Sequence, residues 1–281
     1  MVRRILVIIP IAVFLCFSIL PIKNVGNGES LAIAEGEYFI GELLSSYTTD
    51  FGFSSENRAH NVKKATALIN GTIVKEGEVF SFNGVTGERT ANNGYKESPT
   101  ILNGKYTIGV GGGVCQVSTT LYNAVLLAGL KIERVSPHSL PVGYVPPSMD
   151  AMVSSATDFR FFNDTPYPIT IKGQTKGSKL TFKIYGFKTI TDGESIKYVT
   201  TIIKMLPALY EEVLDDGGEL AENEEYKIIK KAKDGLVSEC YKETYFNGAL
   251  ISSVRIRRDV YNPESGIKLV RSKTQEETKQ V

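Results

Sequence analysis

Residues 109–123, GVGGGVCQVSTTLYN, join a run of glycines directly to an apolar pattern with helical spacing. The apolar positions recur at steps of three and four residues: Val117, Leu121, Val125 and Ala128. This pattern predicts a buried helix that ends at Gly129. Cys115 lies where the glycine loop meets the helix, and the unpaired N–H groups of a first helical turn favour an anion there. A thiol in this position ionises more readily than a free cysteine, whose pKa is about 8.5.

His138 and two aspartates, Asp150 and Asp158, follow Cys115 in the chain. The order Cys, His, Asp occurs in papain-like and transglutaminase-like acyl transfer, in which a thiolate attacks and a histidine relays protons. The candidate catalytic residues are therefore Cys115, His138, Asp150 and Asp158. Other interpretations stay open: Cys115 is a small packing residue or pairs with Cys240 in a disulfide, and His138 only fixes a loop turn.

A second amphipathic helix is predicted between a Ser54-Ser55 cap and a stop at Gly71, with one apolar face: Ala59, Val62, Ala65 and Ile69. Residues 77–84 alternate and predict a strand, whereas residues 104–113 hold too many glycines for either element. Further strands are predicted at residues 131–135, 151–154, 159–162, 167–172 and 180–185. The fold class predicted is α+β, with helices packed on a mainly antiparallel sheet and the Cys-bearing helix after a Gly-rich loop.

The composition changes after Gly186. Residues 210–235 are rich in acidic side chains, which are most simply a solvated face. Alternating runs follow at residues 226–230 and 252–257, and Asn247-Gly248 between apolar segments predicts a tight hairpin turn. These features predict a small all-β module at residues 195–275, followed by a polar tail at residues 276–281.

The N-terminus has the order of a secretory signal, with Arg3 and Arg4 before an apolar run over residues 5–20. We therefore expect a signal or anchor segment at residues 1–22 and a linker at residues 23–44. The run is short for a membrane span, so a cleaved signal and an uncleaved membrane anchor both stay open. Either way, the expected location is extracytoplasmic, secreted or anchored to the cell membrane.

Charge and motifs exclude several function classes. A net charge of +1 over 281 residues provides no global field for a phosphate backbone, so nucleic acid is not an expected partner. Two His and three Cys without CxxC or HExxH spacing leave no common zinc signature. The chain also lacks a phosphate-binding loop and a GxSxG nucleophile elbow. No cofactor and no metal site are predicted, and a metal held by carboxylates alone stays open as an alternative.

Several uncommon words of this sequence, taken together, resemble the VanW domain family over residues 45–186: RAHN at 58–61, GEVFSFN at 77–83, GERT at 87–90, the segment 111–130, and His138-Ser139 with Asp150-Ala151. Ser148 and Met149 stand where the family commonly has glycine and a basic residue. The tail at residues 195–275 is more weakly similar to the small β domain, with conserved glycines, that often follows VanW domains in cell-wall proteins of Gram-positive bacteria.

The resemblance implies export, frequent membrane anchoring and association with peptidoglycan, with no reaction attached to the domain. It also marks a set of site residues. Besides Cys115, His138 and Asp150, the candidate ligand-binding positions are Arg58, Asn61, Ser81, Asn83, Arg89, Gly111, Gly112, Gly113, Gln116, Ser118, Thr119, Thr120, Tyr122 and Asn123.

Three functions are therefore carried forward. The first is an exported protein that binds or helps to remodel peptidoglycan or its peptide stems. The second is a Cys115-dependent acyl transferase or amide hydrolase acting on wall peptides, with His138 as base. The third is a non-catalytic envelope scaffold.

Overall fold

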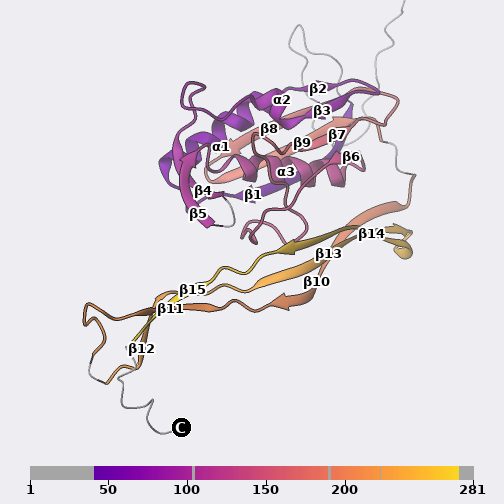
Figure 1. Ribbon diagram of the computed structural model, residues 1–281. Helices are drawn as coiled ribbons and strands as arrows, with labels where there is room; N and C mark the ends of the chain where they lie inside the picture. The colour runs from indigo at the N-terminus through magenta and orange to yellow at the C-terminus, as the bar shows by residue number, and fades with distance from the viewer. Residues whose placement is uncertain (1–40, 103–104, 189–190, 222, 272–281) are drawn as a thin grey trace, which may run out of the picture. The chain divides into compact units, whose positions relative to one another are not determined.

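The computed structural model describes residues 41–102, 105–188, 191–221 and 223–271, which belong to one compact unit (Figure 1). The predicted signal segment and nearly all of the predicted linker lie outside the described residues. None of the helices in the described part of the chain is long and apolar enough to cross a membrane. The domain boundaries expected from the sequence stay predictions.

Three helices and fifteen strands follow one another along the described chain: β1 (Glu42–Asp50), α1 (Glu56–Ile69), β2 (Ile73–Val74), β3 (Val79–Ser81), α2 (Phe82–Thr86), β4 (Glu97–Leu102), β5 (Lys105–Val110), α3 (Val114–Leu127), β6 (Lys131–Arg134), β7 (Arg160–Phe162), β8 (Ile169–Lys176), β9 (Lys179–Gly186), β10 (Glu194–Leu206), β11 (Tyr210–Leu214), β12 (Tyr226–Lys230), β13 (Gly235–Phe246), β14 (Ala249–Tyr261) and β15 (Gly266–Val270).

The predicted fold class, α+β with helices packed on a sheet, is wrong, because the structure is mainly β. Strands make up 46% of the described residues and helices 15%. The long strands β10, β13 and β14 account for much of this difference, with 13, 12 and 13 residues. Short strands such as β2 and β3 add to it, and with two and three residues they are too short to show a period-two pattern in sequence.

One four-stranded sheet, in the order β1-β9-β8-β2, carries much of the core around the two long helices. Figure 1 shows α1 and α3 beside β8 and β9. The Ser45 hydroxyl on β1 donates to the carbonyl oxygen of Ala124 on α3 at 2.6 Å, which fixes the helix on the sheet edge. Phe80 and Phe161, from a second sheet in the order β3-β7-β6, stack with ring centroids 5.0 Å apart. The core is therefore shared between sheets and helices.

The ends of α1 and α3 confirm the helix predictions. Ser55 caps α1 by accepting a hydrogen bond from the Arg58 N–H, and Gly71 follows the helix with φ 87°. Gly129 follows α3 with φ 77°, in the left-handed region that glycine adopts without steric strain. These signals are local, which is why the sequence alone contains them.

Residues 104–113 were expected to form neither helix nor strand, and this expectation is wrong. Lys105–Val110 form β5, which pairs antiparallel with β4 from Leu102 opposite Lys105 to Glu97 opposite Val110. Gly109 suits this strand because a Cβ there would lie only 3.0 Å from the Thr100 methyl group on β4. Glycine therefore serves close strand approach rather than loop formation.

The strand predicted at residues 151–154 is also absent. Ala151 and Val153 are buried, and the segment has no ladder partner among the described residues. Its carbonyl groups instead accept hydrogen bonds from α3, with Ser118 Oγ donating to Ala151 O at 2.6 Å and Cys115 Sγ to Val153 O at 3.3 Å. An extended segment can thus satisfy its polar groups with helix side chains instead of a neighbouring strand.

The described residues between 194 and 270 hold strands and no helix, arranged as sheets β10-β13-β14 and β11-β15-β12. The predicted hairpin turn at Asn247-Gly248 is confirmed: β13 and β14 pair antiparallel, and the two turn residues have φ 50° and 82°. Both values lie in the left-handed region that a two-residue turn of this type needs. The turn sets the register of the longest hairpin in the described chain.

Candidate active site

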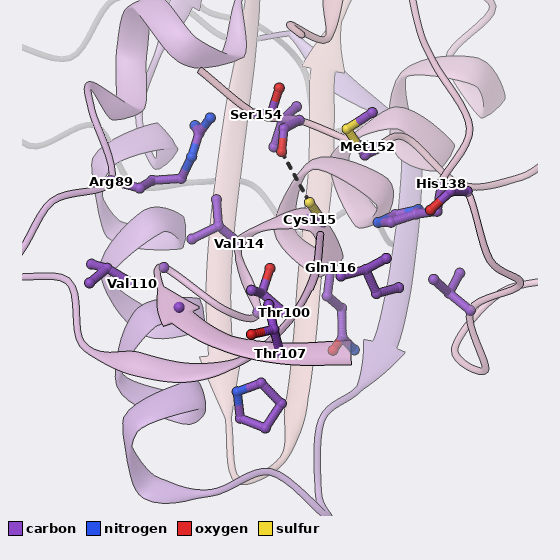
Figure 2. Close-up of a pocket in the computed structure, with 18 of the residues that line it drawn as sticks. Arg89, Thr100, Thr107, Val110, Val114, Cys115, Gln116, His138, Met152 and Ser154 are labelled. Atoms are coloured by element: carbon purple, nitrogen blue, oxygen red, sulfur yellow. Dashed lines mark hydrogen bonds between the residues drawn. The ribbon is translucent and has the colours of Figure 1, made fainter. Parts of the chain in front are cut away.

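Cys115 is the second residue of α3 and faces a pocket of about 1520 Å³. Figure 2 shows its sulfur with Arg89, Gln116, His138, Met152 and Ser154 around it. One wall of the pocket comes from the β4–β5 hairpin, which contributes Thr100 and Thr107. The thiol therefore lies at the start of a buried helix and is accessible from a cavity large enough for a peptide-sized ligand.

The glycines before Cys115 allow the loop to pack closely against its neighbours. A Cβ on Gly112 would come within 3.0 Å of Ser98 Oγ and the Pro99 carbonyl oxygen. Gly113 has φ 101°, and a Cβ there would lie 2.9 Å from Arg58 Cγ. The loop thus enters α3 along a path that only glycine fits, which fixes the position of the thiol.

His138 and Asp150 form a buried pair behind Cys115. His138 Nδ1 lies 2.6 Å from Asp150 Oδ2, and the His138 backbone N–H donates to the same oxygen at 2.6 Å. Because Nδ1 is committed to the carboxylate, Nε2 is the ring nitrogen left for Cys115. The structure therefore brings Cys115, His138 and Asp150 together in the arrangement of a nucleophile, a base and an orienting carboxylate.

The pKa values of these groups favour a thiolate and an imidazolium. Burial opposes ionisation of Cys115, but a hydrogen bond from His138 and its positive charge outweigh burial and lower the pKa of the thiol. Burial also opposes the charged imidazole, yet the hydrogen bonds of Asp150 and Cys115 raise the pKa of His138 to about 9. Asp150 is disfavoured as a carboxylate by burial, but His138 and Tyr261 hold its pKa below the usual range.

Two groups at the pocket are candidate hydrogen-bond donors to an oxyanion. In the first turn of α3, Val114 N donates to Gly111 O and Gln116 N to Gly113 O, whereas the Cys115 N–H has no acceptor among the described residues. Tyr144 lines the pocket, and its pKa is raised by burial and then by the Cys115 charge, so its hydroxyl keeps its proton. Both can donate to a developing negative charge.

Two guanidinium groups also line the pocket. Arg58 donates to Ser54 Oγ at 2.6 Å and to Gln116 Oε1 at 2.8 Å, and Arg89 donates to Asn83 Oδ1 at 2.9 Å. Neither has a carboxylate within 4.0 Å in the described part of the chain. Both act on the charge of Cys115. Two positive charges therefore act on the thiol from the pocket wall, which also contains Glu88.

The remaining candidate positions separate into two groups. Several of them line the pocket: Arg58, Asn83, Arg89, Gly111, Gly113, Cys115, Gln116 and His138. Others are buried in hydrogen bonds or packing within the protein: Asn61, Ser118, Thr119, Thr120, Tyr122 and Asn123. The roles of all of them stay predictions.

Ser81 and Asp158 lie together at the start of α2. Ser81 Oγ donates to Asp158 Oδ2 at 2.6 Å, and the Asn83 N–H donates to Asp158 Oδ1 at 2.9 Å. His138 has no hydrogen bond or ion pair with Asp158 in the described structure, and it is Asp150 that holds the imidazole. Of the two aspartates considered from the sequence, the structure therefore brings Asp150 to the thiol and histidine.

Sequence reasoning missed two residues beside Asp150. From β14, a distant part of the chain, Tyr261 donates a hydrogen bond to the Asp150 carboxylate and Arg257 donates one to the Asp150 backbone carbonyl oxygen. A signal for them existed, because Arg257, Asp259 and Tyr261 alternate along a strand and so share one face. The alternating pattern does not predict which residues of the chain pack against that face.

No disulfide and no metal cluster accompany this site in the described chain. Cys115 and Cys240 are both free thiols, and Cys240 lies against the sulfur of Met149 at 3.5 Å. Among the described residues, no group of three His, Cys, Asp or Glu side chains has an arrangement suited to a metal ion. The site presents a thiol, an imidazole and a carboxylate.

Comparison with known proteins places this region in a family. A family model described as VanW like protein matches residues 57–185. The uncharacterized protein YoaR of Bacillus subtilis (strain 168) is 44% identical over 150 residues, 53% of this chain and 50% of YoaR. Vancomycin B-type resistance protein VanW of Enterococcus faecalis (strain ATCC 700802 / V583) is 34% identical over 128 residues, 42% of this chain and 46% of that protein. This chain thus spans about half the length of the curated relatives that it matches.

A solved structure, the IgA1 protease G5 domain, is similar to 29% of this chain and 94% of that domain, at 17% identity and a TM-score of 0.20. This TM-score is too low to assign a fold. The match at residues 57–185 contains the glycine loop, the thiol, the histidine and the aspartate described above. Residues 57–185 of this chain therefore match the VanW-like protein family.

Proposed function

We propose that this VanW-like domain is a cysteine-dependent acyl transferase or amide hydrolase. The observation that carries the proposal is the buried Asp150–His138 pair at 2.6 Å, whose imidazole also stabilises the ionised thiol of Cys115. A thiolate and an imidazolium at the start of a helix are the resting groups that nucleophilic acyl transfer requires. The proposal concerns the domain; the activity of a longer protein is not implied.

The reaction proceeds in two steps that regenerate the site. The Cys115 thiolate attacks a carbonyl carbon in the pocket, a C–S bond forms, and the C–N bond breaks as His138 Nε2 gives its proton to the leaving nitrogen. Water or an amine then attacks the thioester while His138 accepts its proton, and the C–S bond breaks. Water yields hydrolysis and an amine yields transfer. The Cys115 N–H and the Tyr144 hydroxyl stabilise the oxyanion in both steps.

A wall peptide is the substrate class that best fits the sequence and the comparisons. The expected export signal directs the protein outside the cytoplasm, and a matched relative is named as a vancomycin resistance protein. Peptide stems of peptidoglycan supply amide carbonyls, amines and carboxylates. An envelope location and a peptidoglycan substrate are therefore part of this proposal.

The test of the thiolate is the alkylation rate of each cysteine against pH in the full chain. With iodoacetamide and peptide mass spectrometry, Cys115 is expected to titrate below about 8.5. Cys240 serves as the internal control, because it is buried and burial raises its pKa to about 11. In His138→Ala the pKa of Cys115 is expected to rise, because burial then opposes ionisation of the thiol without the positive charge of His138.

The same groups predict a bell-shaped pH dependence of acyl turnover. Turnover rises with pH as Cys115 loses its proton and falls as His138 loses its own near pH 9, because a neutral imidazole cannot protonate the leaving group. If Cys115 reacts with iodoacetamide only after unfolding, at any pH, the acyl-transfer proposal is wrong.

The charge of the pocket predicts a preference for acyl groups that carry a carboxylate. We expect wild-type Cys115 to prefer iodoacetate over iodoacetamide more than free cysteine does. Arg89→Gln should lower this preference by about 3- to 10-fold, because a hydrogen bond between charged groups is lost. Arg134→Gln is the matched control, since Arg134 is exposed on β6 and outside the pocket. An equal ratio in all three proteins would contradict the preference.

One observation favours a second function, the binding of a wall peptide without chemistry. Cys115 Sγ donates to the Val153 carbonyl oxygen at 3.3 Å, a contact that suits a neutral thiol (Figure 2). If the protein only binds, wild type and Cys115→Ala would co-sediment equally well with purified peptidoglycan. It would show no titration of Cys115 below the ordinary thiol pKa.

A further inference from the structure

A strained turn precedes the aspartate of the site. Ser148 is fully buried and has φ 63°, in the left-handed region that favours glycine. Its N–H donates to the Tyr261 hydroxyl oxygen at 2.7 Å, and its own hydroxyl shares a hydrogen bond with Ser238 Oγ at 2.6 Å. Tyr261 is on β14 and Ser238 on β13. The two strands therefore hold a backbone conformation that serine does not favour.

The same tyrosine reaches the aspartate directly. Its hydroxyl donates to Asp150 Oδ1 at 2.5 Å. The Tyr261 hydroxyl oxygen accepts from the Ser148 N–H, and its single proton goes to Asp150, so the direction of both hydrogen bonds is fixed. Asp150 Oδ2 meanwhile accepts from the backbone and the ring of His138. Each carboxylate oxygen thus has its own donor, one from the VanW-like domain and one from β14.

Arg257, which lies before Tyr261 on the same face of β14, makes a second contact with Asp150. Its Nη1 donates to the Asp150 carbonyl oxygen at 2.6 Å, and its Nη2 lies 3.8 Å from Asp150 Oδ1 and 3.0 Å from Asp259 Oδ2. Its guanidinium also lies over the Tyr122 ring of α3, 5.5 Å from the centroid. The arginine side chain is only 7% exposed, so these contacts occur away from solvent.

We propose that Tyr261 and Arg257 are positioning residues of the active site, and that the β13–β14 hairpin is part of its machinery. The hairpin holds Asp150 in the orientation that keeps His138 aligned with Cys115. The catalytic part of this inference rests on the proposed acyl-transfer function. It gives residues 195–275 a role in the site, beyond that of the separate small all-β module expected from the sequence.

The physical consequence is an effect that passes from β14 through Asp150 to the imidazole. Without the Tyr261 hydroxyl, Asp150 Oδ1 remains buried and loses its hydrogen-bond donor, while Arg257 Nη2 at 3.8 Å remains as a charged neighbour and Tyr144 as a titratable one. A carboxylate that loses a fixed donor is held less firmly and stabilises the imidazolium less well. His138 then becomes a weaker partner for the thiolate.

The test compares Tyr261→Phe with Tyr245→Phe in the full chain. Tyr245 is a matched control because it also bonds a carboxylate, Glu243 Oε2 at 2.6 Å, but on the half-exposed end of β13. The pKa of His138 is read from its imidazole NMR signals, which are assigned with His60→Gln. The apparent pKa of Cys115 is read from iodoacetamide rates, and acyl turnover from p-nitrophenyl acetate hydrolysis.

Tyr261→Phe is expected to lower the His138 pKa, raise the Cys115 pKa and reduce kcat by about 10-fold or more with KM little changed. Tyr245→Phe should leave all three as in wild type. A folded Tyr261→Phe protein with wild-type pKa values would overturn the inference, because the hairpin would then only pack. If the wild-type protein shows no acyl turnover but Tyr261→Phe still shifts the His138 pKa, the positioning role stands and the proposed enzyme activity is rejected.

Arg257 provides the second variant should Tyr261→Phe fail to fold. Arg257→Gln is expected to shift the His138 and Cys115 pKa values in the same directions because Asp150 is held less firmly, and Arg257→Lys to restore them in part because an ammonium group can again donate to the Asp150 carbonyl oxygen. Arg258→Gln is the control, since Arg258 is largely exposed and pairs only loosely with Glu239 at 3.7 Å. Identical titrations in Arg257→Gln and Arg258→Gln would reject the role of Arg257.

Discussion

Cys115→Ser is expected to abolish acyl-ester hydrolysis, with a fall on the order of 10³-fold or more. The thiol ionises in this site because His138 supplies a hydrogen bond and a positive charge. A serine hydroxyl has a much higher pKa, so the same environment leaves it protonated and a poor nucleophile. The backbone should change little, since the two side chains differ in one atom.

The measurement is p-nitrophenolate release from p-nitrophenyl acetate at pH 7, together with the mass of an acetylated intermediate. The adduct is expected on the peptide that contains Cys115 in wild type and nowhere in Cys115→Ser. Cys240→Ala is the control, because it removes a buried thiol that does not line the pocket. Hydrolysis that survives in Cys115→Ser but disappears in Cys240→Ala would place the nucleophile elsewhere.

Gly112→Ala is expected to give the largest loss of stability among single-methyl additions in this loop. Its new Cβ would come within 3.0 Å of Ser98 Oγ and the backbone oxygen of Pro99. Ser98 is buried and donates to the Gly112 carbonyl at 2.9 Å, so the loop and β4 cannot separate without losing that bond. Overpacking of this kind lowers the free energy of unfolding by about 1–3 kcal/mol.

Urea unfolding of the full chain measures this loss. Gly217→Ala is the matched control, because a Cβ there meets nothing within 4 Å and its φ is not in the left-handed region. We also expect Gly112→Ala to slow alkylation of Cys115 at pH 7, since the displaced loop leads into α3. A Gly112→Ala protein as stable as Gly217→Ala would show that the loop accommodates the methyl group.

Local signals predicted the parts of the fold that depend on neighbouring residues. Ser55 and Gly71 delimit α1, and Asn247-Gly248 forms the turn between β13 and β14. The predicted fold class was wrong because a strand forms only with a partner strand, and local sequence patterns do not identify that partner. The glycine-rich β5 is a strand only because β4 pairs with it.

The candidate site follows the same division. The position of Cys115 on a helix start could be predicted, because a glycine run before an apolar stripe specifies it locally. The choice between Asp150 and Asp158 could not, because both follow His138 and only folding brings Asp150 to its ring. Polar residues such as Asn123 belong to the same motif yet bond the Met149 carbonyl oxygen within the core. Motif membership does not separate a ligand contact from a packing contact.

The contact between Tyr261 and Asp150 links the site to the order in which the chain is synthesised. These residues are 111 positions apart, so the helix with Cys115 and the loop with His138 leave the ribosome long before β14 does. A nascent or truncated chain without β14 lacks the hydroxyl that fixes the aspartate. The thiol is thus expected to remain of ordinary reactivity until the hairpin has been made, which delays the appearance of a reactive nucleophile until β14 has been synthesised.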